Sequence, residues 1–178
     1  MRLLGKNGWV DSVFAKGTKP PEPYDFQLPM MSLPGLFVPD TAAIPPAPYL
    51  AADPAGHAMF ANLLKKEAGQ INVGIVWSGS VTFKDNQHRA TTLARFLKHF
   101  GLPDVCLYSL QKGPPEVEMK ALGADAPIVD LAPLIDDFAD TAAAIEQLDL
   151  VLMTDSSVAH LCGALNRPVW LLLAYHAH

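Results

Sequence analysis

From residue 55 onwards, apolar and polar positions follow two alternating patterns. Short continuous apolar runs are separated by longer stretches in which apolar residues recur every three or four positions. Continuous apolar runs of this length predict strands buried on both faces, and the longer stretches predict amphipathic helices. The strands expected from this pattern are INVGIVWS, VCLYSLQ, IVDLA, DLVLMTD and PVWLLLA.

The predicted helices lie between these strands and have recognisable ends. They are HAMFANLLKKEAG, TTLARFLKHFG, EVEMKALG, DDFADTAAAIEQL and SSVAHLCGALN. Asp136 or Asp137 is expected to cap the fourth of them, and its apolar stripe would consist of Phe138, Ala142, Ile145 and Leu148. Strands and helices that alternate in this way predict an α/β fold, with a doubly wound, mostly parallel five-stranded sheet of Rossmann-like type in the order 3-2-1-4-5.

The first 54 residues have a different composition. They contain ten of the 16 prolines, with aromatic residues and methionines between them. Proline fixes φ and removes a backbone donor, so neither regular sheet nor a long helix is expected here. Because free solvation of so many apolar side chains is unfavourable, we expect residues 1–54 to form an arm whose residues 20–50 pack on the domain of residues 55–178. Within the arm, DSVF is expected to form a short strand and MSLPGLF one helical turn.

Charge and cysteine content exclude several classes of function. The net charge is −5, and no basic cluster exceeds the pair Lys65–Lys66, so nucleic-acid binding is not expected. No apolar run reaches membrane-spanning length and the N-terminus does not resemble a signal peptide, which favours a cytoplasmic protein. Cys106 and Cys162 lie in apolar runs without metal-ligand spacing, which is typical of buried reduced thiols and predicts no metal site.

The predicted topology indicates where a ligand would bind. In a doubly wound sheet, ligands lie outside the carboxyl ends of the strands, at the point where the strand order reverses. That point lies between the first and fourth strands, which are followed by the loops Ser78–Arg89 and Thr154–Ser157. The loop Gln111–Gly113 lies one strand further along, so these three loops are the expected site.

The segment TDSSVAHLCGALN, which follows the fourth strand, combines an acid, two hydroxyls and a histidine. At about 100° per residue, one face of its helix would pack on the sheet through Val158, Leu161, Cys162 and Leu165, and the opposite face would carry Ser156 and His160 with Ala159, Gly163 and Ala164. The free N–H groups at the helix start, the helix dipole and the hydroxyls of Ser156 and Ser157 suit a phosphate, and His160 could donate a further hydrogen bond. The alternative is that Asp155 is an ordinary cap, the serines are solvated and His160 is a surface residue.

The other two loops carry groups of the same kind. Ser78 and Gly79 would allow the backbone to approach a ligand closely, while Lys84, Arg89 and Lys112 supply positive charge. Loop cations are usually only solvated, but here cations, hydroxyls and glycines converge on one sheet edge of an acidic chain. The sequence contains neither a glycine-rich dinucleotide fingerprint nor a phosphate-loop lysine motif.

Several segments together resemble one protein family. VGIVWSGS with a following arginine, YSLQKG, and DLAPLIDDFADTAAAIEQLDLVLMTDSSVAHLCGALNRPVWLLL resemble the catalytic part of bacterial heptosyltransferase-like glycosyltransferases, above all those appended to tetratricopeptide repeats. YDFQLPMMSLPGLF and IPPAPYL extend the likeness upstream. The resemblance implies a GT-B fold, whose C-terminal domain holds a nucleotide-diphosphate sugar without a metal or other cofactor.

The resemblance also implies roles for individual residues. It puts Ser156 and Ser157 at the diphosphate with His160 nearby, makes Asp155 a cap or a partner of sugar hydroxyls, and matches Arg89 to the family's basic residue. Three positions depart from the family pattern: Phe83 replaces a histidine, Asp85-Asn86 reverses an Asn-Asp pair, and Ala90 replaces a serine.

On this basis the chain is expected to be the donor-binding part of an inverting glycosyltransferase that acts on a glycan or protein acceptor. NGWVDSVFAKG resembles the last piece of the family's N-terminal domain, so the chain is expected to be a fragment that binds donor weakly and transfers no sugar by itself. The catalytic base is unknown; Asp85 and His88 are the first candidates if the chain does turn over. The alternative is a non-catalytic nucleotide-binding or self-assembling module that pairs with itself, and the presence of an upstream domain in the parent gene would distinguish the two.

Overall fold

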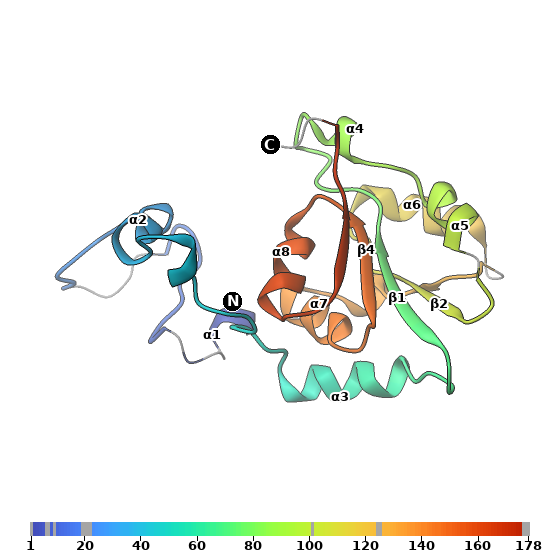
Figure 1. Ribbon diagram of the computed structural model, residues 1–178, viewed down its shortest axis with the longest axis horizontal. Helices are drawn as coiled ribbons and strands as arrows, with labels where there is room; N and C mark the ends of the chain where they lie inside the picture. The colour runs from blue at the N-terminus through green and yellow to red at the C-terminus, as the bar shows by residue number, and fades with distance from the viewer. Residues whose placement is uncertain are drawn as a thin grey trace.

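A parallel sheet organises the chain after residue 70 in the computed structural model, which describes residues 2–5, 8, 10–18, 23–100, 102–123 and 126–175 (Figure 1). Its strands are β1 (Ile71–Val76), β2 (Val105–Ser109), β3 (Val129–Asp130), β4 (Leu150–Thr154) and β5 (Val169–Leu172). They pair in the order β3-β2-β1-β4-β5, and every pair is parallel. The predicted α/β fold and strand order are confirmed.

Helices cover both faces of the sheet because alternate strand residues point to opposite sides. On one face, Val76, Val151 and Met153 pack against residues of α3 (Pro54–Leu63), α7 (Phe138–Ile145) and α8 (Ser157–Ala164). On the other face, Ile75 and Leu152 pack against residues of α5 (Leu93–Phe100) and α6 (Val117–Leu122). The remaining elements of the domain are α4 (Asn86–Arg89) and the 3-10 turns η3 (Pro114–Glu116) and η4 (Ala132–Leu134).

The α7 helix begins where the sequence predicts. The Asp137 carboxylate accepts hydrogen bonds from the N–H groups of Ala139, at 2.7 Å, and Asp140, at 3.3 Å. Asp137 is therefore the cap, rather than Asp136. The predicted apolar stripe is partly wrong: Ala142, Ile145 and Leu148 are buried, but Phe138 is 46% exposed. As the first residue of the helix, Phe138 lies beyond the edge of the core, against a pocket described below.

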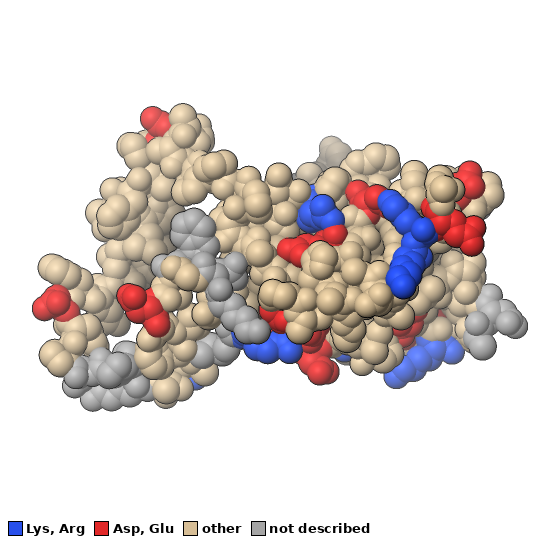
Figure 2. Space-filling model, turned by 90° about the horizontal axis from the view of Figure 1, so that it is seen from below, with Lys and Arg blue, Asp and Glu red and all other residues tan. Residues whose placement is uncertain are grey.

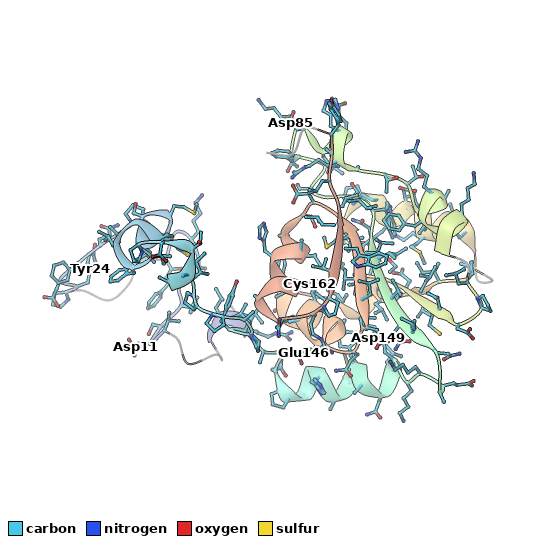
Figure 3. The ribbon with its side chains drawn as sticks, in the orientation of Figure 1. Asp11, Tyr24, Asp85, Glu146, Asp149 and Cys162 are labelled. Atoms are coloured by element: carbon cyan, nitrogen blue, oxygen red, sulfur yellow. The ribbon has the colours of Figure 1, made fainter. Side chains whose placement is uncertain are left out.

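The N-terminal arm does not pack on the domain as expected. It contains α1 (Arg2–Gly5), η1 (Met30–Ser32), α2 (Leu33–Phe37) and η2 (Thr41–Ala43), so the predicted helical turn exists, but residues 11–14 form no strand. Phe26 is 93% exposed and Met31 is 88% exposed. The arm extends away from the sheet in Figure 3, where Tyr24 is labelled, and its surface in Figure 2 is mostly uncharged.

The arm is attached to the domain at both ends. At its start, Arg2 in α1 donates to the carboxylates of Asp137, at 3.0 Å, and Asp140 in α7, and Leu3 packs against the core. The N–H groups of Tyr49 and Leu50 both donate to the carbonyl of Ala164, at 3.0 and 3.2 Å, and the N–H of Ala52 donates to Glu146 Oε1 at 2.9 Å. Further out, hydrogen bonds close locally, for example from Ser32 N to the carbonyl three residues earlier, at 2.9 Å. Proline removes donors that could pair with the domain, which explains why the arm forms short turns of its own. No helix in the described part of the chain is long and apolar enough to cross a membrane.

Candidate functional site

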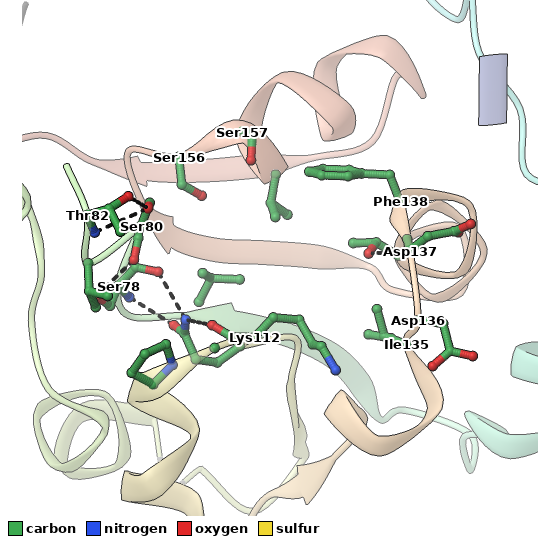
Figure 4. Close-up of a pocket in the computed structure, with 18 residues that line it drawn as sticks. Ser78, Ser80, Thr82, Lys112, Ile135, Asp136, Asp137, Phe138, Ser156 and Ser157 are labelled. Atoms are coloured by element: carbon green, nitrogen blue, oxygen red, sulfur yellow. Dashed lines mark hydrogen bonds between the residues drawn. The ribbon is translucent and has the colours of Figure 1, made fainter. Parts of the chain in front are cut away.

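A pocket of about 610 Å³ lies at the carboxyl ends of β1, β2 and β4 (Figure 4). Its walls come from four segments: residues 76 and 78–82 at and after the end of β1, residues 111–114 after β2, residues 135–138 and 141 around the start of α7, and residues 156–158 at the start of α8. Because β1 lies between β2 and β4 and the connections diverge there, this is the switch point at which the sequence analysis places a ligand.

The structure brings together some of the sequence-predicted site residues and separates others. Those that line the pocket are Ser78, Gly79, Lys112, Ser156 and Ser157. Those that do not line it are Arg89, Asp155 and His160. The separation follows from their positions. His160 is exposed on the outer side of α8, and Arg89 and Asp155 form an ion pair with each other.

The N-terminus of α8 has no side-chain cap. Ser156 is the N-cap residue, with extended backbone, and its side chain makes no capping hydrogen bond. Its Oγ atom is buried and has no hydrogen-bond partner, although Ser156 belongs to the pocket wall. A helix start leaves backbone N–H groups unsatisfied and carries partial positive charge. This end of the pocket therefore offers a hydroxyl and a helix terminus to an anionic group.

Asp155 does not cap α8, which rules out the alternative that Asp155 is an ordinary helix cap. Its Oδ2 atom accepts a hydrogen bond from Arg89 Nη1 at 2.7 Å, in an ion pair whose side chains are 21% (Arg89) and 32% (Asp155) exposed. The Arg89 guanidinium also lies over the Phe83 ring, 4.2 Å from its centroid. Phe83 thus supports Arg89 by a cation–π contact. Together they connect the loop after β1 to the turn between β4 and α8, outside the pocket.

The loop after β1 is held by Asn86, which sequence reasoning missed. Asn86 Oδ1 accepts from the N–H of Gly79 at 3.1 Å, and its Nδ2 donates to Ser78 Oγ at 3.0 Å. A Cβ atom at Gly79 would lie 3.0 Å from Asn86 Oδ1 and 3.7 Å from Ser156 Cβ. The glycine is therefore needed for the close approach of this loop to the α8 turn, in addition to any approach of a ligand.

The opposite wall of the pocket is acidic and aromatic. Asp136, Asp137 and Phe138 line it, and Lys112 reaches toward it, because its Nζ donates to the Ala132 carbonyl at 2.8 Å. Burial alone would raise the pKa of the Asp137 carboxyl, but the capping N–H groups and the Arg2 guanidinium outweigh this and lower it. The pocket thus has hydrogen-bond donors at the α8 end and carboxylate acceptors at the α7 end.

The buried face of α8 agrees with the sequence prediction, but two residues that were expected on the opposite face are also covered: Ala159 packs partly against the core and Ala164 is buried. Leu161, Cys162 and Leu165 are buried and Val158 packs partly against the same core. Ala164 is only 3% exposed. Its carbonyl also accepts the two hydrogen bonds from the root of the arm.

Other pocket residues that sequence reasoning missed include Gln111 as a buried group, Asp136, Phe138 and Thr141. Their signal was weak, because an amide after a strand and the first turn of a helix are common features of α/β folds. In the described part of the chain, no group of three or more His, Cys, Asp or Glu side chains is arranged to hold a metal ion.

Comparison with solved structures shows the fold of the domain. The structure of ADP-heptose lps heptosyltransferase II of E. coli superposes with a TM-score of 0.51 at 15% sequence identity, over 68% of this chain and 38% of that chain. The wall teichoic acid polymerase TagF and a variant of it give TM-scores of 0.44 at 14% and 13% identity, over 67% and 66% of this chain and 28% of each of theirs. No family model and no curated protein matches the sequence. The domain therefore has a Rossmann-like fold that also occurs in a heptosyltransferase, and the match spans about two-fifths of that enzyme.

Proposed function

We propose that the pocket binds a nucleotide-diphosphate sugar and that the chain acts as the donor-binding domain of a glycosyltransferase. The observation that carries this proposal is the uncapped N-terminus of α8, whose N-cap Ser156 has a buried hydroxyl without a partner in the pocket wall. A diphosphate supplies the negative charge and the acceptor oxygens that such a helix terminus lacks.

The two ends of the pocket suit the two parts of this ligand class. Ser156 and Ser157 lie at the donor-rich end, which would hold the diphosphate. Asp136 at the other end could accept hydrogen bonds from sugar or ribose hydroxyls, and the partly exposed Phe138 ring offers an apolar surface beside it. The pocket volume of about 610 Å³ lies within the usual range of small-molecule sites.

The likeness to the heptosyltransferase supports the same function through the fold. In the proposed reaction, the acceptor hydroxyl oxygen bonds to the anomeric carbon while the bond from that carbon to the nucleoside diphosphate breaks. The leaving nucleoside diphosphate keeps the electron pair of the broken bond, and a base outside this chain takes the hydroxyl proton. Preorganised N–H groups at the start of α8 would stabilise the charge that develops on the leaving diphosphate. We assign the catalytic base to no residue of this chain, and the acceptor to a glycan or a protein.

Isothermal titration with nucleoside diphosphates and the matching nucleosides tests the proposal. We expect the diphosphates to bind at least about tenfold more tightly, a difference of about 1.4 kcal/mol, because the helix terminus acts only on the phosphates. Equal affinity for the two ligand types would refute the assignment.

Two variants of Ser156 sharpen the test. Ser156→Ala should weaken diphosphate binding by removing the hydroxyl. Ser156→Asp should abolish it while keeping or raising stability, because aspartate caps a helix well and its carboxylate would occupy and repel the anion site. His160→Ala is the matched control, since His160 lies on the same helix but outside the pocket. Retained diphosphate affinity in Ser156→Asp would place the ligand elsewhere.

Self-assembly is a second candidate, supported by exposed apolar side chains outside the pocket. On the arm, Phe26 and Met31 are almost fully exposed, and on β5 and beyond it, Trp170 is 62% and Leu173 is 61% exposed. Contiguous exposed apolar surface is typical of interaction sites. Sedimentation velocity over a hundredfold concentration range tests this: a monomer throughout would contradict it, and association that Trp170→Ser and Met31→Ser weaken would support it.

A further inference from the structure

Gln111 is a buried amide that joins two walls of the pocket. It is 2% exposed, and its Oε1 atom accepts hydrogen bonds from the N–H groups of Trp77, at 3.1 Å, and Ser78, at 2.9 Å. Its Nε2 atom donates to the carbonyls of Ser78, at 3.1 Å, and Lys112, at 2.9 Å. A glutamine side chain has two donor hydrogens and two acceptor positions, so this amide is fully used.

These bonds replace the backbone ladder at the point where β1 and β2 separate. The ladder continues beyond the strand ends as far as the bond from Leu110 N to the Ile75 carbonyl, at 3.1 Å. At the next position, the Gln111 side chain takes the place of a neighbouring strand for Trp77 and Ser78. The same amide also holds the Lys112 carbonyl. The backbone after β1 and the backbone after β2 are therefore fixed relative to each other by one side chain.

We propose that Gln111 is a positioning residue for the anion-binding pocket, a role that rests on the proposed function. It holds Ser78 in the wall after β1 and Lys112 in the wall after β2, and both residues line the pocket. With its two acceptor positions and two donors, the Gln111 amide keeps both loops in one arrangement before the ligand binds. Ligand binding therefore does not have to pay the entropy of ordering these loops. Preorganisation of this kind raises affinity without a direct contact.

Three variants separate this role from a general contribution to stability. Gln111→Met has a similar length and removes all four hydrogen bonds. Gln111→Glu keeps the two acceptor bonds to Trp77 and Ser78 but loses both donations. Asn72→Leu is the control, because Asn72 is also a buried amide, 1% exposed on β1, but its Nδ2 bonds to the Leu64 carbonyl, remote from the pocket.

The first measurement is amide hydrogen exchange in the free protein. In Gln111→Met, we expect the Trp77 and Ser78 amides to exchange at least about tenfold faster than in the wild type while the centres of β1 and β4 stay protected, because opening is local. In Gln111→Glu, the same two amides should stay protected and exchange should quicken only in residues 112–113. Asn72→Leu should speed exchange across the sheet without singling out Trp77 and Ser78. Unchanged exchange at these amides in Gln111→Met, or equal loss throughout the sheet, would overturn the inference.

The second measurement is affinity for a nucleoside diphosphate and its nucleoside. Gln111→Met should weaken the binding of the nucleoside diphosphate by about tenfold, or about 1.4 kcal/mol, and the binding of the nucleoside much less. Asn72→Leu, measured at a temperature of matched stability, should change neither affinity. A Gln111→Met protein that binds the diphosphate as tightly as the wild type overturns the positioning role. If the wild type binds no nucleoside diphosphate, the proposed function fails, and the exchange experiment alone decides whether Gln111 fixes the two loops. If Gln111→Met does not fold, the exchange pattern of Gln111→Glu makes the same decision.

Discussion

The packing at the centre of the sheet can be tested by one substitution in β1. Gly74 lies in the middle of β1 on the face that α7 covers. A Cβ atom at this position would lie 2.5 Å from Leu148 Cδ1 and 3.0 Å from Leu110 Cδ1. Carbon atoms pack best at about 3.5–4.0 Å, so Gly74→Ala must displace both leucines, which are only 4% and 2% exposed.

The expected effect is a moderate loss of stability. Overpacking a well-filled core by one methyl group costs about 1–3 kcal/mol, and replacing a strand glycine by alanine returns about 0.5–1 kcal/mol of backbone entropy. Because the nearest contact would be only 2.5 Å, we expect a cost at the upper end of this range, and therefore a net loss of about 2 kcal/mol. For a chain of this size, 1 kcal/mol corresponds to about 2–4 °C in Tm, so Gly74→Ala should lower the Tm by about 4–8 °C.

Thermal unfolding followed by circular dichroism measures this effect, with Gly163→Ala as the matched control. Gly163 lies in α8, where an added Cβ atom meets nothing within 4 Å, so alanine should raise stability by about 0.5–1 kcal/mol through helix propensity. The double variant Gly74→Ala with Leu148→Ala should be more stable than the two separate losses predict, since the removed side chain makes room for the added methyl. A neutral or stabilising Gly74→Ala, or strictly additive losses, would refute this account of the packing between β1 and the leucines that follow α7 and β2.

Three further outcomes follow from charges and burial elsewhere in the chain. Burial alone would raise the pKa of the Asp149 carboxyl, but hydrogen bonds, above all from Lys66, lower it overall. The stability that this pair contributes should therefore be present above the ordinary aspartate pKa and lost as pH falls through the lowered pKa. Lys66→Met should accordingly flatten the decrease in Tm between about pH 6 and about pH 3. Burial raises the pKa of the Cys162 thiol to about 12, so at pH 8 a thiol reagent should modify Cys162 only after denaturation, and rapid labelling of the native protein, seen by peptide mass spectrometry, would contradict its burial. Because Arg89 is bonded to Asp155 outside the pocket, Arg89→Gln should change nucleoside diphosphate affinity less than about threefold. A loss in affinity of about tenfold or more would show that Arg89 turns into the pocket when ligand binds.

The sequence by itself determined the strands and the main helices of residues 55–178, their order and the edge of the sheet at which a pocket opens. Strands such as β4 are continuous apolar runs because both of their faces are covered, and this pattern is local and readable. Asp137 was readable as one of two possible caps for the same reason, since a cap bonds to residues two and three positions ahead. The switch point follows from strand order alone, so Ser78, Lys112 and Ser156 could be placed near each other without coordinates.

Only the tertiary structure decided which polar groups pair with each other. Arg89 and Asp155 are 66 positions apart in the sequence, and Gln111 bonds to backbone groups 33 and 34 positions away. No local pattern encodes such a partner, because side-chain direction at a loop is set by the packing of segments that meet only in the folded chain. For the arm, apolar composition predicted burial against the domain, but Phe26 and Met31 are exposed. Apolar content makes burial favourable, yet a segment packs only where a complementary surface lies within its reach, and the proline-rich arm turns on itself before it meets one.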